Sequence, residues 1–96
     1  MLFLLHYRAE NVIAFIKDQM GFGGLQGCCV SWHVEHTPLG TGGAIANAVA
    51  LEKLENEFLV FNADTWVDTS VFQIMQTPGN VIGVIGVNDC SRYGTV

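Results

Sequence analysis

The runs Leu2-Phe3-Leu4-Leu5 and Val30-Ser31-Trp32-His33-Val34 decide the expected fold, together with the residues between them. The first is a short continuous apolar run, which is typical of a buried strand. The second alternates apolar and polar residues, and the expected strand covers residues 28–34. Between the two runs, apolar residues recur at helical spacing from Glu10 to Met20, and glycines follow that end the helix. Strand, helix and strand in this order predict a parallel pair.

The same alternation continues along the chain. The sequence predicts a helix from Ala44, after a glycine-rich turn at 40–43, a strand over 57–62, a short helix over 70–75 and a strand over 81–87. The order β-α-β-α-β-α-β predicts an α/β fold with a mainly parallel sheet and helices on both faces. In such sheets, ligands bind beyond the carboxyl ends of the strands.

Composition narrows the possible functions. Half of the 96 residues (50%) are apolar and only 14% are charged, against roughly 25% in a typical soluble domain. We therefore expect the chain to be part of a larger core. Nine acidic and four basic residues give a net charge of −5, which argues against partners such as nucleic acids or anionic membrane surfaces. No apolar run approaches the ~20 residues that span a bilayer.

The cysteines and histidines do not form a recognisable metal or disulfide framework. Cys28 and Cys29 are adjacent, Cys90 makes the total odd, and no CxxC occurs. We expect Cys28 and Cys29 to be buried on their strand, in a protein of the reducing cytoplasm. His33 and His36 would point to opposite faces of a strand, which disfavours zinc.

The loop Glu35-His36-Thr37-Pro38-Leu39-Gly40-Thr41-Gly42-Gly43-Ala44 is the most informative stretch. Its glycines let a ligand lie against the backbone, and the following helix presents free N–H groups. Thr41 can cap that helix or donate to a ligand. Two interpretations stay open: a site for a flat ring, a ribose or an anion, and a plain strand-to-helix turn. The dinucleotide fingerprint fails because Ile45 stands where its third glycine belongs, and no P-loop Lys-Ser/Thr pair follows.

A carboxylate follows the next expected strand. Asp64 lies shortly after residues 58–61, so it is expected at the same sheet edge as the glycine-rich loop, where it can hold Mg²⁺ against a phosphate. The alternative is an Asp that caps the next turn. Asp68, ahead of Thr69 and Ser70, is expected to be such a cap.

Three ordered blocks resemble those of the sugar-phosphate nucleotidyltransferase family: Glu35-x-x-Pro38 through Ala44, Phe58 through Thr65, and Arg92-Tyr93-Gly94-Thr95-Val96. Together with Tyr7-Arg8-Ala9-Glu10, they cover nearly the whole chain. The resemblance is nearest to the D-glycero-D-manno-heptose 1-phosphate and mannose-1-phosphate guanylyltransferases. It implies that residues 1–96 form the central part of one Rossmann-like, three-layer α/β/α nucleotidyltransferase domain.

The resemblance also implies a reaction, in which a nucleoside triphosphate, here GTP, and a sugar 1-phosphate give a nucleotide sugar and pyrophosphate. It implies that Asp64 holds the cofactor Mg²⁺ and acts as the catalytic residue, while Tyr93 and Gly94 border the sugar. It places Leu39, Gly40, Thr41 and Gly42 where they would line the base and ribose, and it places Glu35 beside the nucleotide.

The sequence departs from the family's pattern in several places. Ala63 stands where the family has glycine. The family's opening glycine-rich loop, which holds the triphosphate, and its later metal-binding Asp are missing. Four scattered cations and a net charge of −5 do not suit turnover of a triphosphate, so we expect the 96 residues alone to be inactive. The alternative function is a non-catalytic nucleotide- or sugar-binding remnant that acts through a partner. An open sheet edge would favour a homo-oligomer in either case.

Overall fold

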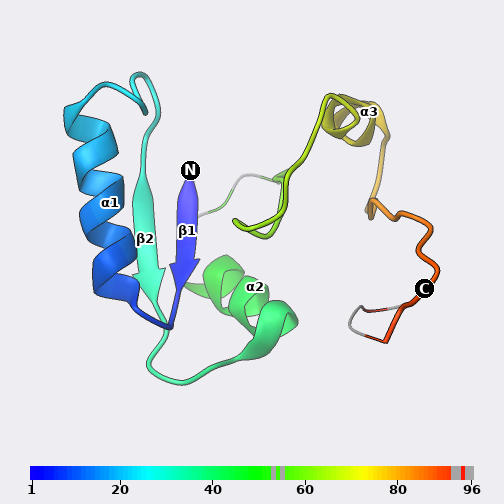
Figure 1. Ribbon diagram of the computed structural model, residues 1–96, viewed down its shortest axis with the longest axis horizontal. Helices are drawn as coiled ribbons and strands as arrows, with labels where there is room; N and C mark the ends of the chain where they lie inside the picture. The colour runs from blue at the N-terminus through cyan, green and yellow to red at the C-terminus, as the bar shows by residue number, and fades with distance from the viewer. Residues whose placement is uncertain (53, 55, 92–93, 95–96) are drawn as a thin grey trace. The chain divides into compact units, whose positions relative to one another are not determined.

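Two parallel strands form the sheet in the computed structural model (Figure 1). Strand β1 (Leu2–Leu5) pairs with β2 (Ser31–Val34), and Leu2 lies opposite Ser31 at the start of the register. The predicted parallel pair is confirmed. The second strand is shorter than expected, because the strand predicted over residues 28–34 begins only at Ser31.

The structure describes residues 1–52, 54, 56–91 and 94. It divides into two compact units, Met1–Phe58 and Leu59–Val96. The strands and two of the helices belong to the first unit. Within the described residues, no helix has both the length and the apolar character needed to cross a membrane.

Helix α1 (Ala9–Gly21) connects the two strands and confirms the helix expected over residues 10–20. Its apolar residues recur every three to four positions, and Ala9 and Ile16 on this helix are buried. Glu10 lies in the first turn, where its charge favours the positive end of the helix. Gly23, with a φ of +80°, follows the end of the helix in a conformation that suits glycine.

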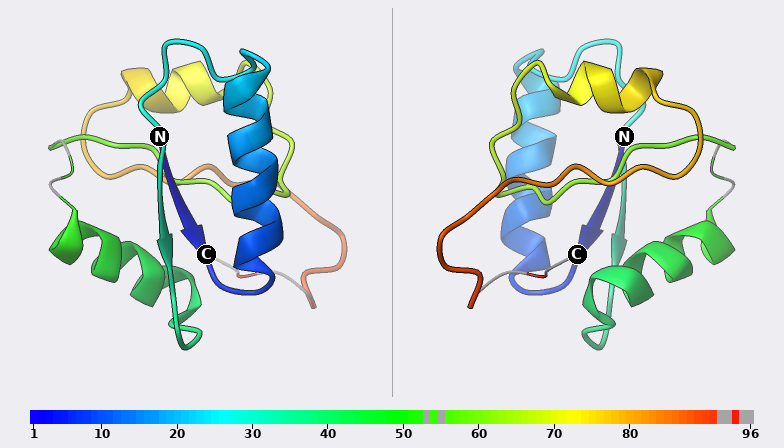
Figure 2. Two further views of the ribbon diagram at one scale, coloured as in Figure 1. Left: turned by 90° about the vertical axis from the view of Figure 1, so that its left-hand side faces the viewer. Right: turned by 90° about the vertical axis from the view of Figure 1, so that its right-hand side faces the viewer.

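Helices α1 and α2 (Gly40–Leu51) cover opposite faces of the two strands, as Figures 1 and 2 show. The side chains of β2 explain this arrangement, since consecutive strand residues point to opposite faces. The Lys17 amine of α1 lies 5.6 Å from the centre of the Trp32 ring. The neighbouring His33 points the other way, and its Nε2 lies 3.1 Å from the amide nitrogen of Asn47 on α2.

Helix α3 (Val71–Gln76) is the regular element of the second unit and confirms the short helix expected there. The prediction of strands over 57–62 and 81–87 is wrong, since the described residues of both ranges form neither strand nor helix. A strand exists only when its N–H and C=O groups pair with a neighbour. At the end of the first range, the Asn62 oxygen instead accepts the Thr65 N–H at 3.2 Å in a local turn.

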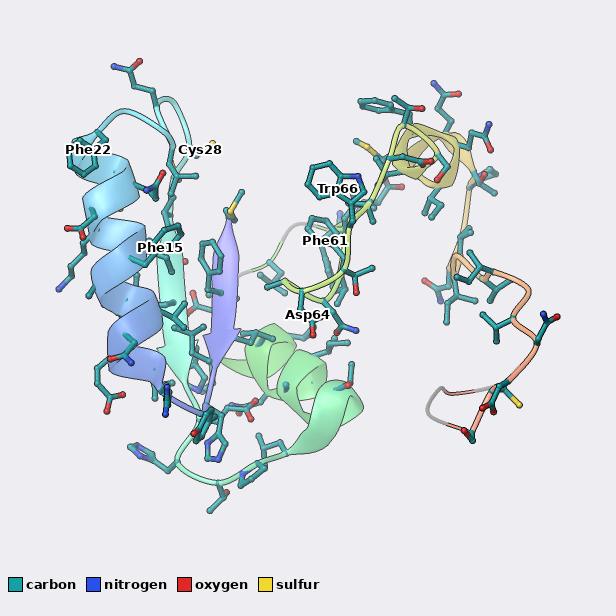
Figure 3. All side chains as sticks on the ribbon, in the orientation of Figure 1. Phe15, Phe22, Cys28, Phe61, Asp64 and Trp66 are labelled. Atoms are coloured by element: carbon teal, nitrogen blue, oxygen red, sulfur yellow. The ribbon has the colours of Figure 1, made fainter. Side chains whose placement is uncertain are left out.

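Few of the described side chains are buried: Ala9, Ile16 and Ala48 form the buried apolar core. Cys28 and Cys29 were expected on a buried strand, but both are exposed because they precede β2. Phe22 and Cys28 project from the first unit and Trp66 from the second (Figure 3). The fold is therefore a small α/β arrangement of two parallel strands and three helices.

Candidate functional site

Glu35 is the first residue of the candidate loop, Glu35–Ala44, where the chain leaves the sheet. It makes hydrogen bonds both to the end of β1 and to the residue before α2. It follows β2 directly, and its N–H donates to the Leu5 oxygen at 2.7 Å, which extends the strand pairing by one residue. The Glu35 carbonyl lies 2.8 Å from Nδ1 of His6. Its carboxylate Oε2 accepts the Leu39 N–H at 3.3 Å. The backbone and the side chain of Glu35 therefore connect the end of β1 with the residue before α2.

The other carboxylate oxygen of Glu35 is shielded from solvent. Glu35 Oε1 has no hydrogen-bond donor among the residues that the structure describes. A shielded carboxylate oxygen without a donor costs about 1–3 kcal/mol or more. The Glu35 side chain is thus a half-satisfied acceptor beside the first turn of α2.

Helix α2 begins earlier than the sequence predicted. The glycines at 40–43 were expected to form a turn before a helix starting at Ala44, but they form the first turn of α2 itself. Leu39 is the N-cap residue and no side chain caps the helix, so of the two roles open to Thr41 the structure does not show capping. Gly40 has a φ of +69°, which lets the chain turn sharply into the helix.

The predicted nucleotide-binding residues Leu39, Gly40, Thr41 and Gly42 lie side by side at the exposed start of α2. A Cβ placed on Gly42 would meet no heavy atom within 4 Å, so the helix start is open there. The first N–H groups of a helix have no intrahelical acceptor. These N–H groups can serve a ligand that approaches the backbone closely.

The Glu35 carboxylate decides which kind of ligand suits this helix start. A helix N-terminus with free N–H groups ordinarily favours an anion. Here a carboxylate already lies at the Leu39 N–H, and a second negative group would be repelled by it. The local chemistry therefore favours an uncharged polar group with hydrogen-bond donors, such as a base or a ribose, over a phosphate.

Asp64, the predicted metal ligand, lies in the second unit, in the turn that the Thr65 N–H closes on the Asn62 oxygen at 3.2 Å (Figure 3). It is exposed, and its carboxylate makes no hydrogen bond with the described residues. Because Asp64 and the Leu39–Gly42 stretch belong to different units, their convergence on one ligand stays a prediction.

Two other aspartates serve turns. Asp68 accepts the Ser70 N–H at 2.8 Å just before α3, which confirms its predicted capping role. Hydrogen bonds from the Ser70 side chain, and then from its backbone, lower the pKa of Asp68. Asp89 accepts the Ser91 N–H at 2.9 Å, and hydrogen bonds from the backbone and then the side chain of Ser91 lower the pKa of Asp89.

Metal-ligating residues do not cluster in the part of the chain that the structure describes. No group of three or more His, Cys, Asp and Glu there is arranged to hold a metal ion. The predicted sugar-binding Tyr93 lies outside the described residues. Gly94, its predicted companion, is exposed, and a Cβ placed on it would meet no heavy atom within 4 Å.

Sequence reasoning did not anticipate the polar contacts of His6 and Asn47. The sequence pattern marks neither residue as functional. The contacts join residues of different elements, His6 with Glu35 at 29 residues' separation and Asn47 with His33 at 14. A weak signal for the first exists in the sequence, because parallel pairing places the residues after β1 and β2 at the same sheet edge.

Comparison with known proteins gives one informative similarity. The chain is 33% identical over 91 residues to the D-glycero-alpha-D-manno-heptose 1-phosphate guanylyltransferase of Campylobacter jejuni subsp. jejuni serotype O:2 (strain ATCC 700819 / NCTC 11168). The match covers 94% of this chain and 38% of that protein. No family model matches the chain, and no solved structure is significantly similar to it. The chain thus has a distant homologue among sugar-phosphate guanylyltransferases and spans about two fifths of its length.

Proposed function

We propose that the chain is part of a sugar-1-phosphate nucleotidyltransferase, which transfers a nucleoside monophosphate from a nucleoside triphosphate to a sugar 1-phosphate and releases pyrophosphate. The observation that carries the proposal is the 33% identity to a heptose 1-phosphate guanylyltransferase over 94% of the chain. GTP is the proposed nucleotide, in keeping with the name of that relative. The same proposal includes a three-layer α/β/α domain, of which residues 1–96 form the central part. It also includes a homo-oligomer and a cytoplasmic location.

In this proposal, the start of α2 holds the base and ribose. Leu39, Gly40, Thr41 and Gly42 supply the open backbone, and Glu35 lies beside them as an acceptor. The guanine edge carries N–H donors, and an ionised carboxylate is an acceptor-only partner for such groups. The negative charge of Glu35 supports placement of the base here and of the phosphates elsewhere.

Asp64 fits the role of the Mg²⁺ ligand. Magnesium commonly takes one or two protein carboxylates and completes its octahedron with water and phosphate oxygens. The Asp64 carboxylate is exposed and makes no hydrogen bond with the other described residues, which supports this role. When bound there, Mg²⁺ would neutralise charge on the triphosphate while the sugar phosphate oxygen attacks the α-phosphorus in line. Tyr93 and Gly94 are proposed to border the sugar.

A chimeric enzyme tests the proposal. The matching segment of the Campylobacter enzyme is replaced by this chain, and pyrophosphate release is measured with GTP, Mg²⁺ and the heptose 1-phosphate. We expect Mg²⁺-dependent turnover, which Asp64→Ala lowers by about 100-fold or more because the metal loses its carboxylate. Glu57→Ala removes an exposed carboxylate seven positions earlier and is expected to leave turnover nearly unchanged.

Two results would contradict the proposal. One is a folded chimera that binds GTP without releasing pyrophosphate, which would favour the alternative of a non-catalytic binding module. The other is equal loss of turnover in the Asp64 and Glu57 variants, which would remove Asp64 from the metal site.

In the same assay we expect no turnover from the 96 residues alone, because the chain has only four scattered cations to offset the charge of a triphosphate.

A further inference from the structure

We propose that His6 is a positioning residue for the loop that runs from Glu35 to Gly42 and is proposed to hold the nucleotide. This inference rests on the proposed function. His6 follows directly on β1, and its Nδ1 lies 2.8 Å from the carbonyl oxygen of Glu35. A carbonyl oxygen only accepts, so Nδ1 carries the proton in this bond. His6 therefore donates to the residue with which the loop leaves the sheet.

The strand register explains why these two residues meet. Leu5 lies opposite Val34 in a parallel pair, so the next residues, His6 and Glu35, leave the sheet at the same edge. The Glu35 N–H is already held by the Leu5 oxygen at 2.7 Å. The imidazole of His6 holds the carbonyl of the same residue, so both backbone polar groups of Glu35 have partners.

A backbone held at both groups directs the Glu35 side chain. Its Oε2 reaches the Leu39 N–H at 3.3 Å, four residues further along the chain. The bonds thus run from His6 through Glu35 to Leu39, the N-cap residue of α2. Leu39 opens the stretch proposed to hold the base and ribose, so His6 acts on the nucleotide through Glu35 without touching it. A loop held in its binding shape loses less conformational freedom when the ligand arrives.

In this proposal the bond to Glu35 depends on a donor at the position of Nδ1 of His6. Asn and Gln at position 6 therefore form a matched pair of variants. An Asn side chain places its amide nitrogen near the position of Nδ1, whereas a Gln side chain reaches further, toward the position of Nε2. Asn at position 6 is therefore able to keep the bond to Glu35, and Gln is not. His6→Ala removes the donor altogether.

The test uses the whole 96-residue chain labelled with ¹⁵N and titrated with GTP at millimolar concentrations. The amide resonances of Leu39, Gly40, Thr41 and Gly42 report on the loop. We expect His6→Ala to shift the Leu39 resonance before any nucleotide is added and to weaken GTP binding about threefold, the effect of one exposed hydrogen bond. We expect His6→Asn to restore both readouts and His6→Gln to restore neither.

The outcomes separate the two proposals. If the wild-type chain binds GTP and His6→Ala binds it equally well, the positioning role is overturned while the proposed function stands. If Asn and Gln behave alike, the bond to Glu35 is not what matters, and the role is again overturned. If GTP leaves the loop resonances of the wild type unchanged, the start of α2 does not hold the nucleotide in this chain and the positioning role is overturned, while the chimeric enzyme still decides the proposed function. The amides of the buried residues Ile16 and Ala48 report whether each variant is folded. If His6→Ala does not fold, the comparison of His6→Asn with His6→Gln decides the positioning role.

Discussion

Gly40 is the residue on which the course of the candidate loop depends most directly. Its φ of +69° lies in the left-handed region, which costs residues with a Cβ about 1–2 kcal/mol. Leu39 before it has a φ of −93°, so the change of direction from loop to helix falls on Gly40. The sequence predicted a backbone that a ligand can approach here, and the structure adds the reason why glycine is needed.

Gly42 and Gly43 are neighbours in the first turn of α2 with opposite surroundings, and they form a matched test. A Cβ on Gly43 would lie 2.9 Å from the Leu39 Cβ, whereas one on Gly42 would meet nothing within 4 Å. We expect Gly42→Ala to raise the free energy of unfolding by up to about 1 kcal/mol through helix propensity. Gly43→Ala is expected to lower it by about 1 kcal/mol through the clash. Urea denaturation followed by circular dichroism measures both, and equal stabilisation by the two changes would show that the contact with Leu39 is absent in solution.

The role of single residues could be predicted only where it is local. Asp68 was expected to cap a turn, and it accepts a bond from Ser70, two positions away. Glu35 was expected beside the nucleotide, but its bonds to His6 and Leu39 depend on strand register and on the start of α2. Long-range contacts of this kind carry almost no pattern in the sequence, because they arise only once the strands have paired.

At the scale of elements, we expect α3 to depend on the carboxylate of Asp68, which accepts the Ser70 N–H just before the helix. A helix of six residues is marginal by itself, so the turn at its start matters. Hydrogen bonds from Ser70 lower the pKa of Asp68, so their stabilisation is present above the pKa of the unfolded chain. It is lost as the pH falls through the lowered pKa of the folded state.

We therefore expect Asp68→Ala to reduce the helicity of residues 71–76 at neutral pH and to have little effect in strong acid, where the wild type approaches the variant. The ¹³Cα chemical shifts of those residues, measured across pH, test this. Asp64→Ala is the control, since the Asp64 carboxylate accepts no hydrogen bond from the other described residues. A difference between wild type and Asp68→Ala that persists unchanged at low pH would show that the carboxylate charge is irrelevant.

Elements with a strong local pattern were predicted well, and those that depend on neighbours were not. The spacing of Val12, Ile13 and Ile16 is sufficient to indicate α1. The four residues before Ala44 are poor helix formers, so the earlier start of α2 was not expected. The apolar runs at 57–62 and 81–87 match strands in composition. A strand also requires a partner with free N–H and C=O groups, and composition cannot show whether one is present.

At the scale of the whole molecule, the dominant feature is exposed apolar surface. Large apolar side chains are exposed in both units, including Phe15, Phe22 and Trp66, which is 94% exposed. The sequence predicted this in outline, because half of its residues are apolar and few are charged. Exposed apolar segments with high strand propensity tend to associate.

The segment 81–87 is the sharpest case, since it holds β-branched residues and glycines without a charge, and Ile85 is 86% exposed. We expect Ile85→Lys to slow concentration-dependent association, measured by light scattering. Asn80→Lys makes the same change in charge next to the segment without removing an apolar side chain. Both changes move the net charge of −5 toward zero, which by itself favours association. Equal behaviour of the two variants would show that the apolar segment is not responsible.

The alternation of Trp32 and His33 along β2 guards the strand against misalignment. Trp32 lies under a lysine of one helix, and His33 meets an asparagine of the other. A slip of β2 by a single position would swap these two side chains between the faces, forcing an indole onto the amide and an imidazole onto the amine. Two chemically unlike neighbouring side chains thus favour one register of this four-residue strand, because in that register Trp32 and His33 each contact their own helix.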